Sequence, residues 1–273
     1  MTASSTQTPA TPQRRPGKRK AVAVGVIIQA RMTSRRFPGK SMAPLMNKPV
    51  LQHVIERCKA IKSPFGYSKP LVIVAMPDDP ASEPMGQLVQ RLKVDHFVGS
   101  EYNVLERYYH AAKFFNLDYV VRITADCPFI SPIICQQVLH LLIWRKCDYV
   151  SNCYPTESRT FPKGLDCEAF TMDCLEAAHV IVEQEYDKYT RIKSLGKEKF
   201  ETILKQLDYC REHVTPWMVD EPNLKRAIVK QKEDRSNLNW CVDVPEDIPR
   251  LEAMYEEIMK IHKNNSNDNK VLH

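Results

Sequence analysis

The stretch VIIQARMTSRRFPGK, from Val26 to Lys40, joins an apolar run directly to a cationic loop. The run that begins at Val22 and reaches Ile28 has the length and β-branching of a strand buried inside a parallel sheet. The loop after it carries four cations within ten residues, Arg31, Arg35, Arg36 and Lys40. Such cations repel one another unless solvent or an anion lies between them. The loop therefore indicates either a bound anion or a solvated surface.

Strands and helices alternate after this loop. Apolar periodicity predicts helices over residues 48–61, 82–92, 103–115 and 131–144, the second with Ser82 as its cap, and strands over 70–76, 95–100 and 118–126. Past Asp148 the pattern weakens, with strands expected over 148–155, 164–170 and 238–244 and a helix over 172–184. Such alternation is typical of a parallel sheet with right-handed crossovers, so the predicted fold class is α/β.

Composition and charge bound the domain organisation. Of 273 residues we expect 1–21 to be a disordered basic tail, 22–262 one domain and 263–273 a polar C-terminal tail. The first twenty residues hold five cations and no acid, and the rest of the chain holds 34 basic and 33 acidic residues. A nearly neutral domain argues against a nucleic-acid partner, and no apolar stretch is long enough to cross a bilayer.

Cysteine usage indicates the compartment. The nine cysteines include no C-x-x-C pair, and no secretory signal precedes them. Reduced thiols are therefore expected and the localisation is predicted to be cytoplasmic. The basic tail leaves a nuclear or organellar address as the alternative.

Three strand ends carry the candidate chemistry, because ligands of open α/β sheets bind beyond the carboxyl ends of the strands. The first strand ends in Gln29, Ala30 and Arg31, and two later strands end at Asp126 and Asp243. Cations for phosphate oxygens and carboxylates for a metal are what a nucleoside triphosphate with Mg²⁺ requires. The alternatives are a solvated cationic face and aspartates that cap helices. The P-loop and dinucleotide glycine motifs are absent from this loop.

Two further groups are weaker candidates. Asp166 and Glu168 would lie on one face of a strand with Cys167 opposite, and could bind polyol hydroxyls or simply face solvent. His213, near Trp217, could be an acid, a base or a ligand contact, or a histidine satisfied by its neighbours.

Five ordered blocks make the sequence resemble the spore-coat polysaccharide type of cytidylyltransferase: QARMTSRRFPGK, VRITADCPFISP, GLDCEAF, REHVTPW and VDVPEDI. That family is similar to the CMP-sialate and CMP-3-deoxy-manno-octulosonate synthetases. The resemblance implies a Rossmann-like GT-A nucleotidyltransferase fold, with a mostly parallel sheet and helices on both faces. It also implies transfer of CMP from CTP to a nonulosonic or octulosonic acid, or a related sugar or polyol phosphate, with release of pyrophosphate.

The resemblance also implies roles for individual residues. Nucleotide contacts would come from Gln29, Ala30, Arg31, Arg36, Lys40 and Thr124, with Arg31 and Lys40 catalytic. Asp126 and Asp243 would hold Mg²⁺ or Mn²⁺. The acceptor would contact Arg122, Asp166, Glu168 and His213. The partners would be CTP and a small sugar-type acceptor, and a homodimer is expected with its contact within 171–215.

The sequence departs from the family pattern at four positions: Thr33 and Ala125 replace glycines, Arg35 replaces a threonine and Phe37 replaces a leucine. None of these changes removes an expected cation or metal ligand. Two rival functions stay open at this point. A GT-A glycosyltransferase would use a nucleotide sugar, but its usual D-x-D element is absent at Asp126. A homologue that binds nucleotide without catalysis is the other rival.

Overall fold

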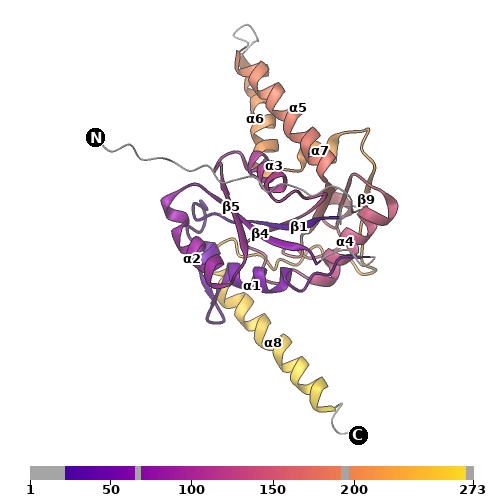
Figure 1. Ribbon diagram of the computed structural model, residues 1–273. Helices are drawn as coiled ribbons and strands as arrows, with labels where there is room; N and C mark the ends of the chain where they lie inside the picture. The colour runs from indigo at the N-terminus through magenta and orange to yellow at the C-terminus, as the bar shows by residue number, and fades with distance from the viewer. Residues whose placement is uncertain (1–21, 65–68, 192–196, 269–273) are drawn as a thin grey trace, which may run out of the picture.

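The computed structural model describes residues 22–64, 69–191 and 197–268, and its main sheet has seven strands (Figure 1). In spatial order these are β5 (Asp95–Gly99), β4 (Leu71–Pro77), β1 (Val24–Gln29), β6 (Tyr119–Thr124), β8 (Glu168–Thr171), β7 (Tyr149–Ser151) and β9 (Arg226–Ile228). The four from β5 to β6 are parallel, β8 is antiparallel to both of its neighbours, and β7 and β9 are parallel. The predicted α/β fold with a mostly parallel sheet is confirmed.

Helices cover both faces of this sheet (Figure 1). One face packs against α1 (Val50–Cys58), α2 (Glu83–Arg91) and α4 (Pro132–Arg145). The other packs against α3 (Val104–Phe114), α5 (Met172–Arg191), α6 (Lys197–His213) and α7 (Pro216–Asp220). None of the helices within the described residues combines the length and apolarity that a membrane span requires.

Strand β1 shows why the opening run is continuously apolar. Val26 and Ile28 point into the cluster beneath α1, α2 and α4, whereas Ile27 points into the cluster on the opposite face. All three side chains have no exposed surface. A strand that alternates between two buried faces needs apolar residues at every position, which the sequence supplies.

The predicted helices 103–115 and 131–144 begin at the residues that cap α3 and α4, whereas α2 begins differently. Asn103 and Ser131 cap α3 and α4, each accepting a hydrogen bond from a backbone N–H of the first turn. The expected cap Ser82 makes no such bond. A short 3₁₀ helix, Pro80–Ser82, leads into α2 instead, and the side chain of Asp79 caps it.

The last described element is α8 (Asp247–Asp268), which projects away from the body (Figure 1). Its first turns pack Leu251 against the small hairpin of β2 (Pro44–Leu45) and β3 (Lys48–Pro49). The helix continues past the domain boundary expected at residue 262. The expected tail 1–21 and residues 269–273 lie outside the described residues.

Residues 238–244 are not the strand that the sequence predicted. Only one isolated bridge forms, between Lys163 and Asn239. The Trp240 N–H donates to the Lys163 carbonyl (2.7 Å) and the Val242 N–H to the Asp126 carbonyl (2.9 Å). Because these partners belong to two separate loops, no ladder develops. The sheet edge next to β7 is taken by β9, which the sequence pattern did not indicate.

Candidate active site

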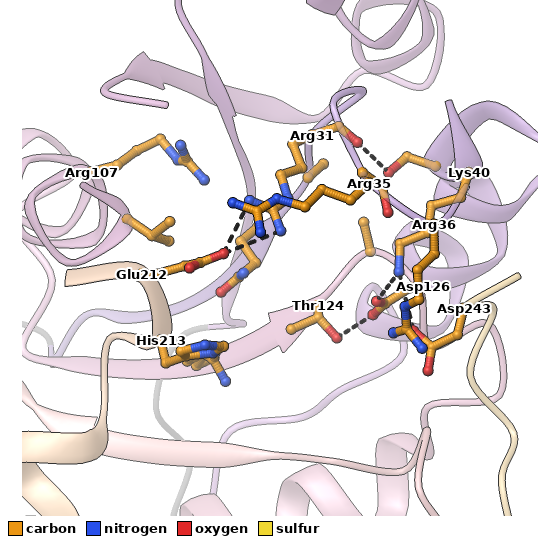
Figure 2. A pocket seen from close by; sticks show the side chains of 17 residues that line it. Arg31, Arg35, Arg36, Lys40, Arg107, Thr124, Asp126, Glu212, His213 and Asp243 are labelled. Atoms are coloured by element: carbon orange, nitrogen blue, oxygen red, sulfur yellow. Dashed lines mark hydrogen bonds and ion pairs between the residues drawn. The ribbon is translucent and has the colours of Figure 1, made fainter. Parts of the chain in front are cut away.

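A cavity of about 530 Å³ opens at the carboxyl ends of β1 and β6 (Figure 2). These strands are paired neighbours, so Gln29 lies opposite Thr124 in the register. The cavity wall contains every residue expected at the site except Asp166 and Glu168, namely Gln29, Ala30, Arg31, Arg36, Lys40, Arg122, Thr124, Asp126, His213 and Asp243. Segments far apart in the sequence therefore meet where ligands of α/β sheets bind.

The loop after β1 folds back on itself and so presents its cations. Gly39 adopts a left-handed conformation (φ 75°), and its N–H donates to the Met32 carbonyl (2.8 Å). The Ser41 hydroxyl donates to the Arg31 carbonyl (3.1 Å). Glycine reaches this conformation without the steric cost that a Cβ adds. The closed loop leads into a short 3₁₀ helix whose first residue is Lys40.

Lys40 is the electrostatic centre of the cavity (Figure 2). Its Nζ lies 2.6 Å from Asp126 Oδ2 and 3.5 Å from Asp243 Oδ1. The side chain is only 13% exposed, so water screens these pairs less than it screens surface ion pairs. Burial alone would lower the pKa of Lys40, but the two carboxylates outweigh burial and raise it. The ammonium therefore stays charged.

Asp126 is held ionised by its surroundings. Burial by itself would raise the pKa of this carboxyl group, but the Lys40 ammonium and the Thr124 hydroxyl, which donates to Oδ1 (2.6 Å), lower it below its usual value. Ionised carboxylate oxygens are the ligands that Mg²⁺ and Mn²⁺ prefer.

Asp243 lies near the Lys40 ammonium and belongs to the segment that precedes α8. The Val242 N–H donates to the Asp126 carbonyl, and the Val242 carbonyl accepts from Lys40 Nζ (3.0 Å).

Asp247 holds the turn that follows Asp243, since its Oδ2 accepts from the N–H groups of Asp243 (2.7 Å) and Val244 (3.0 Å). Arg36 adds a second cation 2.8 Å from Asp243 Oδ1.

The opposite wall comes from α3 and the end of α6 (Figure 2). Glu212 pairs with Arg31 at 3.4 Å, with both side chains nearly half exposed. Burial lowers the pKa of the neighbouring His213, and the positive charges of Arg122 and Arg31 lower it further, against an opposing effect of Glu212. His213 is therefore a neutral imidazole near pH 7.

Arg107 is a cavity residue that we did not expect from the sequence. Only 2% of it is exposed, and burial lowers its pKa to about 10. Its guanidinium donates to the Ser100 carbonyl, while its Nε has no hydrogen-bond partner. The spacing along the helix is a sequence signal for this position, because Arg107 follows the inward-facing Val104 by three residues and so lies on the same face of α3. A charge at an inward position marks a ligand contact or a buried pair.

Asp166 and Glu168 are placed differently from our expectation. Asp166 precedes β8 rather than lying on it, and both its oxygens accept from Arg159 (2.6 and 2.9 Å). Glu168 is 1% exposed and pairs with Arg122, while the Tyr149 hydroxyl donates to it (2.6 Å). Both carboxylates thus have partners from this chain beside the cavity. Of the four residues expected to contact an acceptor, Arg122 and His213 line the cavity.

The arrangement suits a polyanionic ligand. The wall carries six cations, Arg31, Arg35, Arg36, Lys40, Arg107 and Arg122. Asp126 and Asp243 converge on one cationic centre, and no cluster of three or more His, Cys, Asp or Glu that could hold a metal occurs among the described residues. A metal bound by the two aspartates would complete its coordination with water and ligand oxygens, as Mg²⁺ commonly does beside phosphates.

Comparison with known proteins points in the same direction. A family model described as cytidylyltransferase matches residues 25–271. An uncharacterised protein of Methanocaldococcus jannaschii is 30% identical over 86% of this chain and 82% of its own length. The spore coat polysaccharide biosynthesis protein SpsF of Bacillus subtilis is 25% identical over 85% of each chain. A 3-deoxy-manno-octulosonate cytidylyltransferase of Pectobacterium carotovorum is 35% identical, over 49% of this chain and 51% of its own.

Solved structures share the fold. A cytidylyltransferase from Leptospira borgpetersenii superposes with a TM-score of 0.68 at 27% identity, covering 90% of this chain and 96% of that one. A CMP:2-keto-3-deoxy-manno-octonic acid synthetase complexed with CTP gives a TM-score of 0.54 at 17% identity, over 86% of this chain and 99% of that one.

Proposed function

Because this chain belongs to the cytidylyltransferase family and is thus a nucleotidyltransferase, we propose that it transfers CMP from CTP to a sugar acid and releases pyrophosphate. The acceptor would be a nonulosonic or octulosonic acid, or a related sugar or polyol phosphate. The observation that carries the proposal is the meeting of Lys40, Asp126 and Asp243 beside the cationic loop after β1. The family resemblance inferred from the five sequence blocks is confirmed.

The reaction would need little covalent chemistry from the protein. A hydroxyl oxygen of the acceptor loses its proton to water and forms a bond to the α-phosphorus of CTP, and the bond from that phosphorus to the pyrophosphate oxygen breaks. Negative charge builds up on the α-phosphate and the leaving group. Arg31 and Arg36 would bind phosphate oxygens through their forked N–H groups and Lys40 as a point charge, so the charge forms in a site already arranged for it.

The two aspartates fit a divalent cation, Mg²⁺ or Mn²⁺. Both carboxylates already face one positive centre, the Lys40 ammonium, and Asp126 is held ionised. When bound there, a divalent cation would neutralise charge on the phosphates. Lys40 and Arg36, which here neutralise Asp126 and Asp243, would then be available to phosphate oxygens.

The acceptor would enter between β6 and the end of α6. Arg122 and His213 line this side, and Arg107 stands nearby on α3 with an unsatisfied Nε. Guanidinium groups recognise carboxylates in a planar, two-point geometry. These arginines therefore support an acceptor that carries a carboxylate or a phosphate.

A homodimer through residues 171–215 stays part of the proposal. The hairpin of α5 and α6 protrudes from the body (Figure 1), and Val180, Ile181 and Tyr209 on it are 40%, 40% and 44% exposed. Light scattering coupled to size exclusion would report a dimer mass, and replacing Ile181 with Glu should convert it to the monomer mass. A monomer mass for the unaltered protein would contradict a dimer.

The decisive experiment is pyrophosphate release from CTP, UTP, GTP, ATP and dTTP, with Mg²⁺ or with EDTA, against sugar acids and sugar phosphates. We expect release from CTP that requires both the metal and an acceptor, and its loss in Asp126→Asn. Transfer of sugar from a nucleotide sugar without pyrophosphate release would identify a glycosyltransferase instead. CTP binding with no release for any acceptor would contradict catalysis and favour a silent homologue.

A further inference from the structure

Two cysteines lie close in the sequence to the two aspartates of the candidate site. Cys127 follows Asp126 directly, and Cys241 lies two residues before Asp243. Their sulfur atoms are 3.8 Å apart although the residues come from distant segments. The two segments are joined by the hydrogen bond from the Val242 N–H to the Asp126 carbonyl (2.9 Å). The thiol pair therefore lies where these two segments meet.

This pair differs from the remaining thiols in access. Eight of the nine cysteines are buried, and Cys241 alone is partly exposed. Its partner Cys127 is 1% exposed and packs beside the site, with Sγ 3.1 Å from the Thr124 hydroxyl and 3.5 Å from Asp126 Oδ1. A partly exposed cysteine next to a second cysteine is the arrangement found in redox-sensitive pairs.

We propose that Cys127 and Cys241 are a redox modification site, at which a peroxide forms a reversible disulfide that switches off nucleotidyl transfer. The inhibitory effect rests on the proposed function, whereas the disulfide itself does not. No other component is required beyond the peroxide as oxidant and a small thiol as reductant.

The chemistry balances with hydrogen peroxide. The sulfur of Cys241 forms a bond to one peroxide oxygen, the O–O bond breaks, and a sulfenic acid and one water result. The sulfur of Cys127 then attacks the sulfur of Cys241, the S–O bond breaks, and a second water leaves. The two sulfurs give up two electrons, which reduce the peroxide, and both thiol hydrogens end in water.

The disulfide would disturb both aspartates. The sulfurs must approach from 3.8 Å to about 2.05 Å, which draws the 241–243 segment and the loop after β6 together. Cys127 would leave the Thr124 hydroxyl, and Asp126 and Asp243 would shift relative to Lys40. Because a misplacement of about 1 Å at reacting groups can cost about a hundredfold in rate, a loss of at least about tenfold is expected.

The test treats the reduced full-length protein with hydrogen peroxide, alkylates free thiols under denaturing conditions, and maps peptides without reduction. We expect one crosslinked peptide pair that contains Cys127 and Cys241, with Cys135 and Cys167, both fully buried, still alkylated. Turnover should fall at least about tenfold and return with dithiothreitol. Cys241→Ser should give no crosslink and keep its turnover after peroxide.

Cys147→Ser is the matched control, because Cys147 is buried just before the amino end of β7, away from the cavity. It should retain both the crosslink and the sensitivity to peroxide.

Full alkylation of Cys127 and Cys241 after peroxide would overturn the proposal, and so would oxidation of Cys241 to sulfinic acid without a crosslink. A crosslink that leaves turnover unchanged would overturn the switch. Absence of turnover in the reduced protein would refute the proposed function, while the peptide map alone would still decide the disulfide.

Discussion

At the scale of single residues, the candidate site depends most on Lys40. Its ammonium neutralises two carboxylates that come from different parts of the chain and is itself mostly buried. Pairs of this kind differ from exposed ones, in which solvent reduces the interaction to a small contribution. Removing the cation leaves Asp126 without its partner at the place where phosphate charge is expected.

We expect Lys40→Met to lower turnover at least about tenfold, the scale of one lost charged contact to a transition state. The free energy of unfolding should fall by about 1–3 kcal/mol, since the partly buried carboxylate of Asp126 loses its charged donor. Steady-state kinetics and urea unfolding measure the two effects. The control is Lys48→Met, because Lys48 pairs with Glu56 at an exposed position and both quantities should change little. Equal turnover in the two variants would show that Lys40 does not contribute to catalysis.

His53 provides a pH prediction outside the site. It is 4% exposed, and its Nε2 lies 2.8 Å from the Leu45 carbonyl. Burial lowers its pKa below the usual 6.5, although the hydrogen bond to Leu45 opposes this effect. As the pH falls through 6.5, the unfolded chain takes up a proton that folded His53 resists, so the stability falls.

The measurement is urea unfolding at about pH 7.5 and pH 5.5. The unaltered protein should lose stability at the lower pH, and His53→Gln should lose less. The lowered pKa values of His179 and His213 leave the variant some of the dependence. An unchanged pH dependence in His53→Gln would show that His53 does not contribute.

At the scale of elements, α3 links the protruding hairpin to the cavity. Its cap Asn103 is 3% exposed, and its Oδ1 accepts from the Glu106 N–H (3.0 Å). The amide Nδ2 donates to Glu183 on α5 (2.8 Å). The same helix presents Arg107 to the cavity. One side chain therefore both starts the helix and joins it to its neighbour.

We expect Asn103→Ala to cost about 1–3 kcal/mol, the sum of a lost cap and a lost hydrogen bond to a carboxylate. Ser131→Ala is the matched control, because Ser131 caps α4 through a longer bond (3.4 Å) and its loss should cost about 0.5–1 kcal/mol. Chemical denaturation compares the two free energies. A cost for Asn103→Ala no larger than that for Ser131→Ala would show that the bond to Glu183 adds nothing.

At the scale of the whole molecule, backbone contacts between distant loops assemble the site. Gly164 has φ +94°, and a Cβ there would lie 2.6 Å from the Trp240 carbonyl carbon. The bridge from Lys163 to Asn239 aligns the same two loops. The segment that carries Asp243 is therefore positioned by backbone contacts and not by the sheet.

Gly164→Ala should destabilise the protein and reduce turnover, because both the positive φ and the backbone contact oppose a methyl group. We expect a cost of about 1–3 kcal/mol and, if the proposed divalent cation binds Asp126 and Asp243, a lower affinity for it. Gly86→Ala is the control, since α2 leaves open space at that position and alanine favours a helix. Thermal unfolding measures the stability of each variant, and titration of its activity with Mg²⁺ or Mn²⁺ measures the affinity for the metal. Unchanged stability and turnover in Gly164→Ala would show that the loops around Gly164 and Trp240 accommodate a methyl group, which would contradict this prediction.

The sequence by itself determined the first half of the fold and the cationic side of the site. The strands β1, β4, β5 and β6 and the helices α1 to α4 follow local periodicity, because a buried strand or an amphipathic helix carries its environment in its own pattern. The loop cations and Asp126 lie directly at strand ends, so topology alone brought them to one edge of the sheet.

Only the tertiary structure decided how the remaining groups meet. Asp243 reaches Lys40 on a segment that is not a strand, Arg107 enters from an inward face of α3, and Asp166 and Glu168 pair with Arg159 and Arg122. Each of these outcomes depends on which group of the folded chain lies next to the charge. Local periodicity holds no information on that choice, because the energy of a buried charge is set by the partners that surround it in space.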